Sequence, residues 1–245
     1  MKKYQNYAEK AVKVIENIVA TQNDKIEETI DIMFRTFQDG KSIFAFGATH
    51  AGIFTEESYA RAGGLMIINP IFSSTLMVDT KPMTLTSDLE RLEGFGTVLL
   101  NNNPIKEGDL LIIHSVSGRN AVGIDMAISA KAKGIYVIAI TSQAYKDNIK
   151  SRHSSGLFLS DIADLNIDNC GEFGDACVAV DGEITAGATS TVACAAIANM
   201  LSVGFCEKCK ENGIEPPVFE SANKDRDDER TFRLITKYHK QIHYI

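Results

Sequence analysis

Four short apolar runs rich in β-branched residues most strongly constrain the fold of this chain. They are "SIFAFGA" (42–48), "LMIINPI" (65–71), "DLLIIHS" (109–115) and "IYVIAITS" (135–142). Each is too short for a helix of its own, and continuous apolarity is typical of strands buried on both faces. "DLNID" (164–168) is a weaker fifth candidate. The runs therefore predict a sheet in the interior of the protein.

Helical patterns alternate with these runs. The spacing of apolar residues predicts helices at 4–21, 24–38, 50–62, 87–101, 120–133, 189–212 and 225–242. Strands alternating with helices predict a parallel sheet covered on both faces. We expect a three-layer α/β sandwich with a five-stranded sheet. It forms a single domain over residues 1–245, with helical extensions at 1–40 and 213–245.

Composition narrows the class of protein. The chain has 245 residues, 44% of them hydrophobic and 23% charged, which is typical of a globular domain. Its formal charge of −7 disfavours a nucleic-acid partner. The N-terminus shows neither a signal-peptide nor a membrane pattern, and five cysteines, an odd number, favour reduced thiols in the cytoplasm. The C-x-x-C of Cys206 and Cys209 is expected to be structural, with no metal.

Small polar residues follow three of the four strand runs. They are Thr49, Ser115, Ser117, Gly118, Asn120 and Ser142. Ligands of open parallel sheets bind beyond the carboxyl ends of the strands. Hydroxyl groups and a helix N-terminus suit a phosphate, and glycine allows the backbone to approach it closely. The alternative is that these residues only cap helices.

Two nucleotide-binding motifs do not fit. A Walker loop needs lysine after its last glycine, and "GATHAG" is followed by Ile53. A dinucleotide fingerprint needs a middle glycine where this chain has Thr49. The pattern therefore favours a small molecule that carries a single phosphate.

Several segments resemble the sugar isomerase (SIS) domain, which binds phosphosugars. "FGATHAG" follows the first strand run, "SVSGRN" the third and "ITS" the fourth, as in that domain. "FAFGATHAGIFTEESYARAGG", "ERLEGFGTVLL" and "DIADLNIDNCGEFGDA" resemble more narrowly a bacterial branch of stand-alone SIS proteins. The resemblance implies a flavodoxin-like sheet and a homodimer or homotetramer with active sites near subunit contacts. It implies that Ser115, Ser117 and Asn120 hold the phosphate, assisted by Thr49 or Ser142.

An isomerase also needs a carboxylate base. Glu56 and Glu57 resemble the "AEE" segment of SIS heptose-phosphate isomerases, which implies a catalytic Glu57; a solvated helix face is the alternative. Glu183 precedes "TAGATSTVA", which resembles a segment of glucosamine-phosphate-synthase-type SIS domains. That likeness makes Glu183 a second candidate base and Ser190 and Thr191 candidate ligand contacts.

The histidines and one arginine complete the candidates. His50 follows a strand end and is expected to open the sugar ring or polarise a carbonyl group. His153 is the second choice, whereas His114 lies within a strand run and is expected in the core. Arg119 either contacts the ligand anion or faces water.

The sequence as a whole favours an aldose–ketose sugar phosphate isomerase that acts through an enediol. No organic cofactor, nucleic acid or membrane is expected as a partner. One alternative is a non-catalytic phosphosugar sensor that regulates another process. The other is an amino sugar phosphate deaminase or lyase, because enolisation assisted by a glutamate serves those reactions too.

Overall fold

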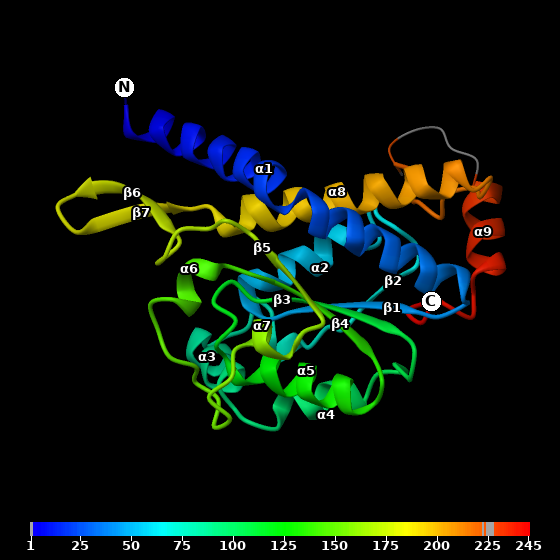
Figure 1. Cartoon of the computed structure of the whole chain (residues 1–245), viewed down its shortest axis with the longest axis horizontal. Coiled ribbons are helices and arrows are strands. Elements are labelled where there is room, and N and C mark those ends of the chain that lie inside the picture. Colours follow the sequence, from blue (N-terminus) through cyan, green and yellow to red (C-terminus); the bar gives the residue numbers. More distant parts are fainter. Residues whose placement is uncertain (1, 222, 224–227) are drawn as a thin grey trace.

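The computed structural model describes residues 2–221, 223 and 228–245, and a five-stranded parallel sheet forms its centre (Figure 1). The strands lie in the order β2-β1-β3-β4-β5. Their bounds are Ile68–Pro70 (β2), Ile43–Gly47 (β1), Leu110–His114 (β3), Tyr136–Thr141 (β4) and Leu165–Asp168 (β5). Every strand falls within a predicted run, and all the pairings are parallel. The predicted α/β fold is confirmed.

The middle of the sheet is buried on both faces. All five residues of β3 are buried. Leu110 and Ile112 pack into the core on one face of the sheet, and Leu111 and Ile113 pack into the core on the other. Successive side chains of a strand point to opposite faces. A strand with helices on both sides therefore needs apolar residues at every position, as these runs have.

Helices form the two outer layers (Figure 1). One face is covered by α1 (Lys3–Gln38), α2 (Ile53–Ser58) and α8 (Ser190–Glu211). The other is covered by α4 (Phe95–Asn101), α5 (Ala121–Ala132) and α7 (Leu159–Ile162). The predicted three-layer sandwich is confirmed.

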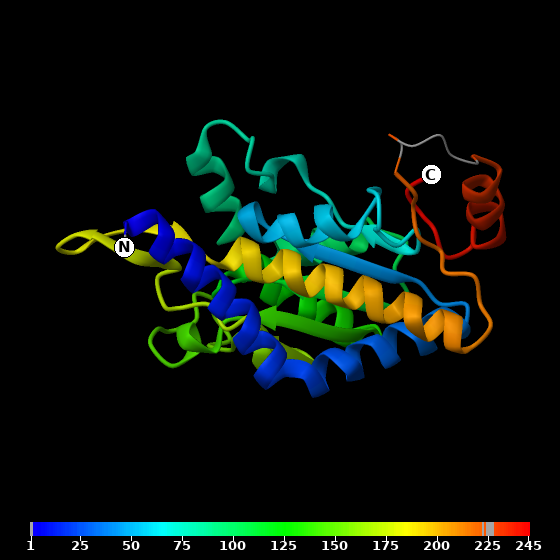
Figure 2. The ribbon, with the colours of Figure 1, turned by 90° about the horizontal axis from the view of Figure 1, so that it is seen from above.

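The helix α8 is long and apolar enough to span a membrane by length and composition alone. In the fold it lies along α1 and buries Ala193, Ile197 and Phe205 in the core (Figures 1 and 2). The core helices of soluble proteins meet the same criterion. We therefore interpret α8 as a core helix.

The first helix differs from its prediction. Two helices were predicted, at 4–21 and 24–38, but α1 is continuous from Lys3 to Gln38. Buried polar residues explain the difference, because Gln22 and Thr29 continue the buried stripe of Ile18, Ile26 and Met33. The Gln22 side chain accepts a hydrogen bond from the Asp168 N–H at 3.0 Å. Gln22, which lies between the two predicted helices, is thus part of the packing.

The segments predicted as helices at 50–62 and 87–101 are also divided differently. The first becomes a 3-10 helix, Thr49–Gly52, followed by α2. The second becomes α3 (Met83–Glu90) and α4, separated by a turn at Gly94, which has φ = 88°. The Gly94 N–H donates to the Asp125 carboxylate at 2.6 Å. This long-range contact fixes the turn, and α3 therefore ends at Glu90.

A β-hairpin was not predicted. Its strands are β6 (Ala176–Asp181) and β7 (Ile184–Ala188), and it lies beside the N-terminal end of α1 (Figures 1 and 2). Asp-Gly at 181–182 is a known turn signal for a hairpin. The hydroxyl of Tyr7 donates to the Ala188 carbonyl at 2.9 Å, which attaches the hairpin to α1.

The remaining elements are short or peripheral. They are a 3-10 helix at Ser74–Leu76, α6 (Gln143–Lys146) and α9 (Asp228–Lys237). The predicted start of the last helix, 225–227, lies outside the described residues. Leu234 of α9 packs with Met66 and Ile242 in a small cluster of its own.

The close approach of α4 to α5 yields a stability prediction. A Cβ on Gly96 would lie 2.0 Å from the Val122 carbonyl oxygen, whereas one on Gly123 would meet nothing nearer than 3.8 Å. Gly96→Ala is expected to lower the free energy of unfolding by about 2 kcal/mol through overpacking. Gly123→Ala, the matched control, should leave it equal or raise it by up to ~1 kcal/mol. Urea denaturation measures both, and equal effects would contradict the packing argument.

Candidate functional site

A cavity of about 360 Å³ opens at the carboxyl ends of β1 and β3. Gly47 and His114, the last residues of these strands, lie opposite each other in the sheet. The loops that follow therefore start at the same edge. Six of the predicted site residues line this cavity, and two of them lie at the N-terminus of α8. The wall includes Thr49, His50, Glu90, Ser115, Ser117, Tyr145, Asp175, Ser190 and Thr191.

The loop after β3 presents two serine hydroxyls to the cavity. Gly118 adopts φ = 62°, and its N–H closes the turn on the Ser115 carbonyl at 3.1 Å. The Gly118 carbonyl in turn accepts from the Leu159 N–H at 2.8 Å. Neither the Ser115 nor the Ser117 hydroxyl hydrogen-bonds to another described residue. The loop is thus fixed by its backbone while both hydroxyls stay available to a ligand.

The loop after β1 is equally tight. A Cβ on Gly47 would lie 2.3 Å from the Ala51 carbonyl oxygen, so only glycine fits there. Thr49 has φ = 55°, a left-handed conformation that is uncommon for threonine. Strained residues of this kind cluster at functional sites. Thr49 and His50 both line the cavity.

Two predicted phosphate ligands are engaged elsewhere in the chain. The buried Ser142 hydroxyl donates to the Gly171 carbonyl at 2.7 Å. Asn120 precedes α5 but its side chain does not cap that helix. Its Oδ1 accepts from Arg152 Nη1 at 2.9 Å, and its amide also hydrogen-bonds to Glu90. The structure therefore joins Asn120 to a carboxyl group and a guanidinium group.

Glu90 is a cavity residue that the sequence analysis missed. Burial raises the pKa of its carboxyl group, and Asn120, Arg152 and Arg91 partly oppose that rise. A carboxyl group with a raised pKa in a cavity is typical of an acid–base site. Glu90 opens the segment "ERLEGFGTVLL" quoted above, but no catalytic motif marks it, and the turn at Gly94, far in sequence from the loop after β3, brings it to the cavity.

Asp175 is a second cavity residue that was not among the predicted site residues, although it lies in the family-like segment "DIADLNIDNCGEFGDA". Its carboxylate accepts from the Thr189 N–H at 3.0 Å, the Ser190 N–H at 2.8 Å and the Ser190 hydroxyl at 2.5 Å. It therefore occupies the N-terminus of α8, the favourable place for a negative charge on a helix. The Ser190 hydroxyl is used in this contact, and Thr191 lies beside it in the cavity wall.

The glutamates proposed from the sequence lie outside this cavity. Glu57 forms an ion pair with Arg61, and its Oε1 accepts from Asn199 Nδ2 of α8 at 2.8 Å. Glu56 is exposed on α2. Glu183 is exposed in the turn of the β6–β7 hairpin. The structure thus brings none of them to the cavity of this chain.

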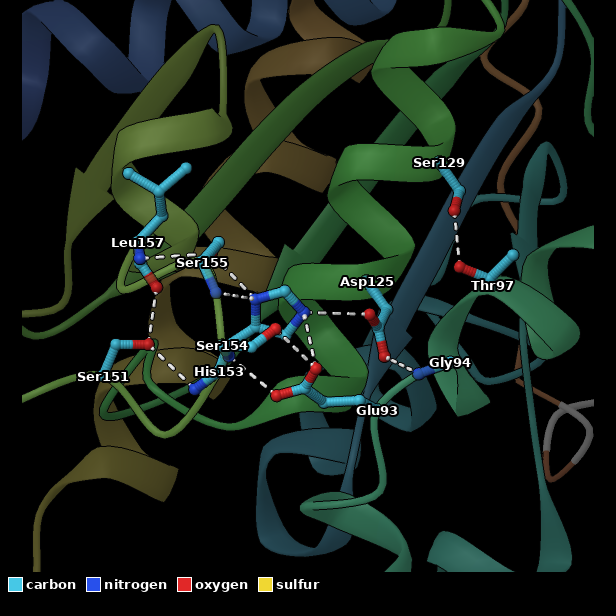
Figure 3. Close-up of polar contacts among 10 residues, drawn as sticks. All are labelled: Glu93, Gly94, Thr97, Asp125, Ser129, Ser151, His153, Ser154, Ser155 and Leu157. Carbon is cyan, nitrogen blue, oxygen red and sulfur yellow. Dashed lines mark hydrogen bonds and ion pairs between the residues drawn. The ribbon is translucent and has the colours of Figure 1, made fainter.

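His153 lies in a polar network with Glu93, Asp125 and Ser155 (Figure 3). Its Nε2 is 3.1 Å from Asp125 Oδ1, and its Nδ1 is 2.7 Å from the Ser155 hydroxyl. The ring therefore braces the loop 151–158 against α5. It is not a wall residue of the cavity. Arg119 is half-buried, and its Nε is buried with no partner among the described residues.

His114 is buried in the core, as expected from its place in a strand. Burial lowers the pKa of its ring to about 4. Its Nδ1 lies 2.9 Å from the Ala51 carbonyl oxygen, so Nδ1 carries the proton. The described residues contain no cluster of three or more His, Cys, Asp or Glu side chains placed to hold a metal. Cys206 and Cys209 lie within α8 and are free thiols.

Known proteins resemble this chain in sequence. A profile of the SIS domain matches residues 6–142. The UPF0309 protein of Shouchella clausii is 46% identical over 245 residues, which cover 98% of this chain and 100% of that protein. The UPF0309 protein of Oceanobacillus iheyensis is 43% identical over 240 residues, which cover 98% of each.

Solved structures resemble it in fold. A phosphoheptose isomerase from Francisella tularensis superposes with a TM-score of 0.51 at 14% identity, covering 84% of this chain and 100% of that one. The phosphoheptose isomerase of Neisseria gonorrhoeae gives 0.52 at 14% identity, covering 85% and 97%. At such identities the likeness concerns the fold alone. From the sequence matches, the resemblance to stand-alone SIS proteins is confirmed, and the chain belongs to the UPF0309 family of SIS-domain proteins.

Proposed function

We propose that this protein binds a phosphosugar in the cavity and isomerises it between aldose and ketose forms. The observation that carries the proposal is that unengaged hydroxyl groups and a carboxyl group of raised pKa line one cavity. The hydroxyls suit a phosphate, and the carboxyl suits proton transfer. The SIS domain and the fold shared with phosphoheptose isomerases support the same substrate class.

The phosphate is proposed to lie between the two loops. Ser115 and Ser117 donate from one side and Thr49 from the other. The N-terminus of α5 follows directly and adds a favourable partial positive charge. Anchoring the phosphate positions the reacting carbons against the far wall, so binding energy remote from the chemistry orients the substrate.

Glu90 is proposed to move the proton. Its carboxylate takes a proton from the carbon beside the carbonyl, and the carbonyl oxygen gains a proton, which gives an enediol. The Glu90 carboxyl group then returns its proton to the former carbonyl carbon, while the hydroxyl group on the neighbouring carbon loses its proton and becomes the new carbonyl. His50, on the cavity wall, donates to the carbonyl oxygen and stabilises its developing charge. Burial makes the Glu90 carboxylate a stronger base than an exposed one. The hydrogen lost at one carbon is gained at the next, so the atoms balance.

Glu57 and Glu183 are the bases expected from the sequence. Because both lie outside the cavity of their own chain, either could serve as the base only at the cavity of a second copy. Valines on α1 and α8 are more than half exposed, namely Val12, Val19 and Val203. Val19 and Val203 line one groove between these helices. We propose that this face pairs with a second copy in a homodimer, in which a partner glutamate near the cavity is the alternative base.

The phosphate anchor is tested by Ser117→Ala. Hydrogen bonds to a charged group are worth about 1.5–3 kcal/mol, so affinity for sugar phosphates should fall roughly tenfold or more. A thermal-shift screen over a panel of sugar phosphates finds the ligand, and titration calorimetry measures the loss. Ser129→Ala, on α5 beside Thr97, is the control and should bind normally. If Ser117→Ala binds sugar phosphates as tightly as the wild type, Ser117 does not hold the phosphate.

The role of Glu90 is tested by Glu90→Gln. Solvent-deuterium exchange at the sugar carbon should fall by roughly 10²–10⁴ while ligand binding persists, because amides do not accept this proton. Wild-type kcat should rise with pH as Glu90 ionises, at higher pH than for an exposed carboxyl group because its pKa is raised.

Glu56→Gln, at an exposed glutamate, is the matched control and should retain exchange. If Glu90→Gln still exchanges solvent deuterium at the wild-type rate, Glu90 is not the base, and Glu57 or Glu183 takes that role. A wild-type protein that binds sugar phosphates but exchanges no proton with any of them is a sensor.

The homodimer is tested by Val203→Asp. A charge placed in the α1–α8 groove should convert the dimer to a monomer in light scattering at micromolar concentration, because burying an unpaired carboxylate is costly. Val98→Asp on α4, which is similarly exposed on the opposite layer, should leave the mass unchanged. A monomeric wild type would contradict the proposed pairing.

A further inference from the structure

Two arginines lie near Glu90, which lines the cavity, and a third lies near one of them. Arg91 follows Glu90 directly at the end of α3, Arg119 lies in the loop that carries Ser117, and Arg152 lies in the loop 151–158. Partial burial lowers the pKa of Arg152, and the positive charges of Arg119 and Arg91 lower it further. The positive charges of Arg152 and Arg91 also lower the pKa of Glu90, against the effect of burial. We call Arg91, Arg119 and Arg152 the arginine cluster.

The cluster carries more positive charge than its surroundings neutralise. No carboxylate oxygen of a described residue lies within 4.0 Å of a guanidinium nitrogen of its three members. By contrast, Arg61 and Arg230 are each paired with a glutamate at that distance. The buried Nε of Arg119 has no hydrogen-bond partner among the residues described. Buried donors without partners are costly, so an anion is the natural occupant.

The position of Arg152 is fixed by the chain around it. Its N–H donates to the Arg119 carbonyl at 3.0 Å, and its Nη1 donates to Asn120 Oδ1 at 2.9 Å. These contacts hold the loop 151–158 against the phosphate loop.

The two residues that follow Arg152 are held as well (Figure 3). His153 Nε2 meets Asp125 at 3.1 Å, and the Ser154 N–H and hydroxyl donate to Glu93 at 2.7 and 2.6 Å. The network drawn in Figure 3 therefore holds the chain that follows Arg152, while Asn120 orients the guanidinium group itself. Preorganised groups of this kind bind with a smaller entropy loss.

We infer that the arginine cluster binds a second anionic group of the substrate, so that the substrate class is a phosphosugar that also carries a carboxylate or a second phosphate. The inference rests on the proposed function, in which Ser115 and Ser117 hold the first phosphate. Guanidinium groups match both carboxylate and phosphate bidentately. The second anion would lie next to Glu90, and the reacting carbons would lie between the two anchors.

Matched ligand pairs test this inference. Titration calorimetry compares glucose 6-phosphate with 6-phosphogluconate, which adds a carboxylate, and fructose 6-phosphate with fructose 1,6-bisphosphate, which adds a phosphate. The wild type should bind at least one doubly anionic ligand tenfold or more tightly than its partner. Which pair shows the preference identifies the second group.

Arginine variants test whether the cluster causes the preference for doubly anionic ligands. Arg119→Gln and Arg152→Gln should abolish the preference and change the affinity for the singly phosphorylated ligand less than threefold. Arg152→Lys should retain part of the preference, because it keeps the charge. Arg35→Gln, at an exposed arginine of α1, is the control and should keep the preference. Far-ultraviolet circular dichroism and the melting temperature confirm that each variant folds.

The possible failures are distinct. If the wild type binds both members of each pair equally and Ser117→Ala weakens both, the inference is wrong and the proposed function stands. If the arginine variants weaken both members of a pair equally, the cluster assists a single phosphate and the inference is likewise wrong. If the wild type binds none of the four ligands, the proposed phosphosugar site fails and the inference fails with it.

Discussion

The contact between the His114 ring and the Ala51 carbonyl oxygen, at 2.9 Å, holds the two sides of the site together. His114 ends β3, and Ala51 lies in the loop after β1. The ring is buried, and its pKa of about 4 keeps it neutral at neutral pH, so Nδ1 donates without the cost of a buried charge. Gly47 brings the first loop close enough for this contact. The loops proposed to bind phosphate depend on that spacing.

Asp125 plays a comparable part on the other side of the cavity. It is almost fully buried in α5 and accepts from the Gly94 N–H at 2.6 Å, while its other oxygen meets His153 at 3.1 Å. One carboxylate therefore orients two segments that are far apart in the sequence. The first ends α3 at Glu90, and the second carries Arg152. The proposed base and the arginine cluster share a support in the core.

The charges around the cavity are arranged asymmetrically although the whole chain carries −7. Asp175 occupies the N-terminus of α8, which leaves that wall negative. The N-terminus of α5 meets serine hydroxyls and the arginine cluster instead. Local donors near a ligand outweigh a distant net charge. In the proposed function, this asymmetry directs the anionic group of the ligand to the α5 side and leaves Asp175 to accept hydrogen bonds from the sugar hydroxyls.

The sequence by itself determined the parallel sheet, most of its helices and the loop of Ser115 and Ser117, because local patterns decide these features. Continuous apolar runs require strands buried on both faces, and a glycine among serines at a strand end marks a turn. Only the tertiary structure decided that Glu90 and Asp175 line one cavity, that the three arginines lie near one another, and that Glu57 pairs with Arg61. Those placements come from contacts such as Gly94 with Asp125, between residues that no periodic pattern relates.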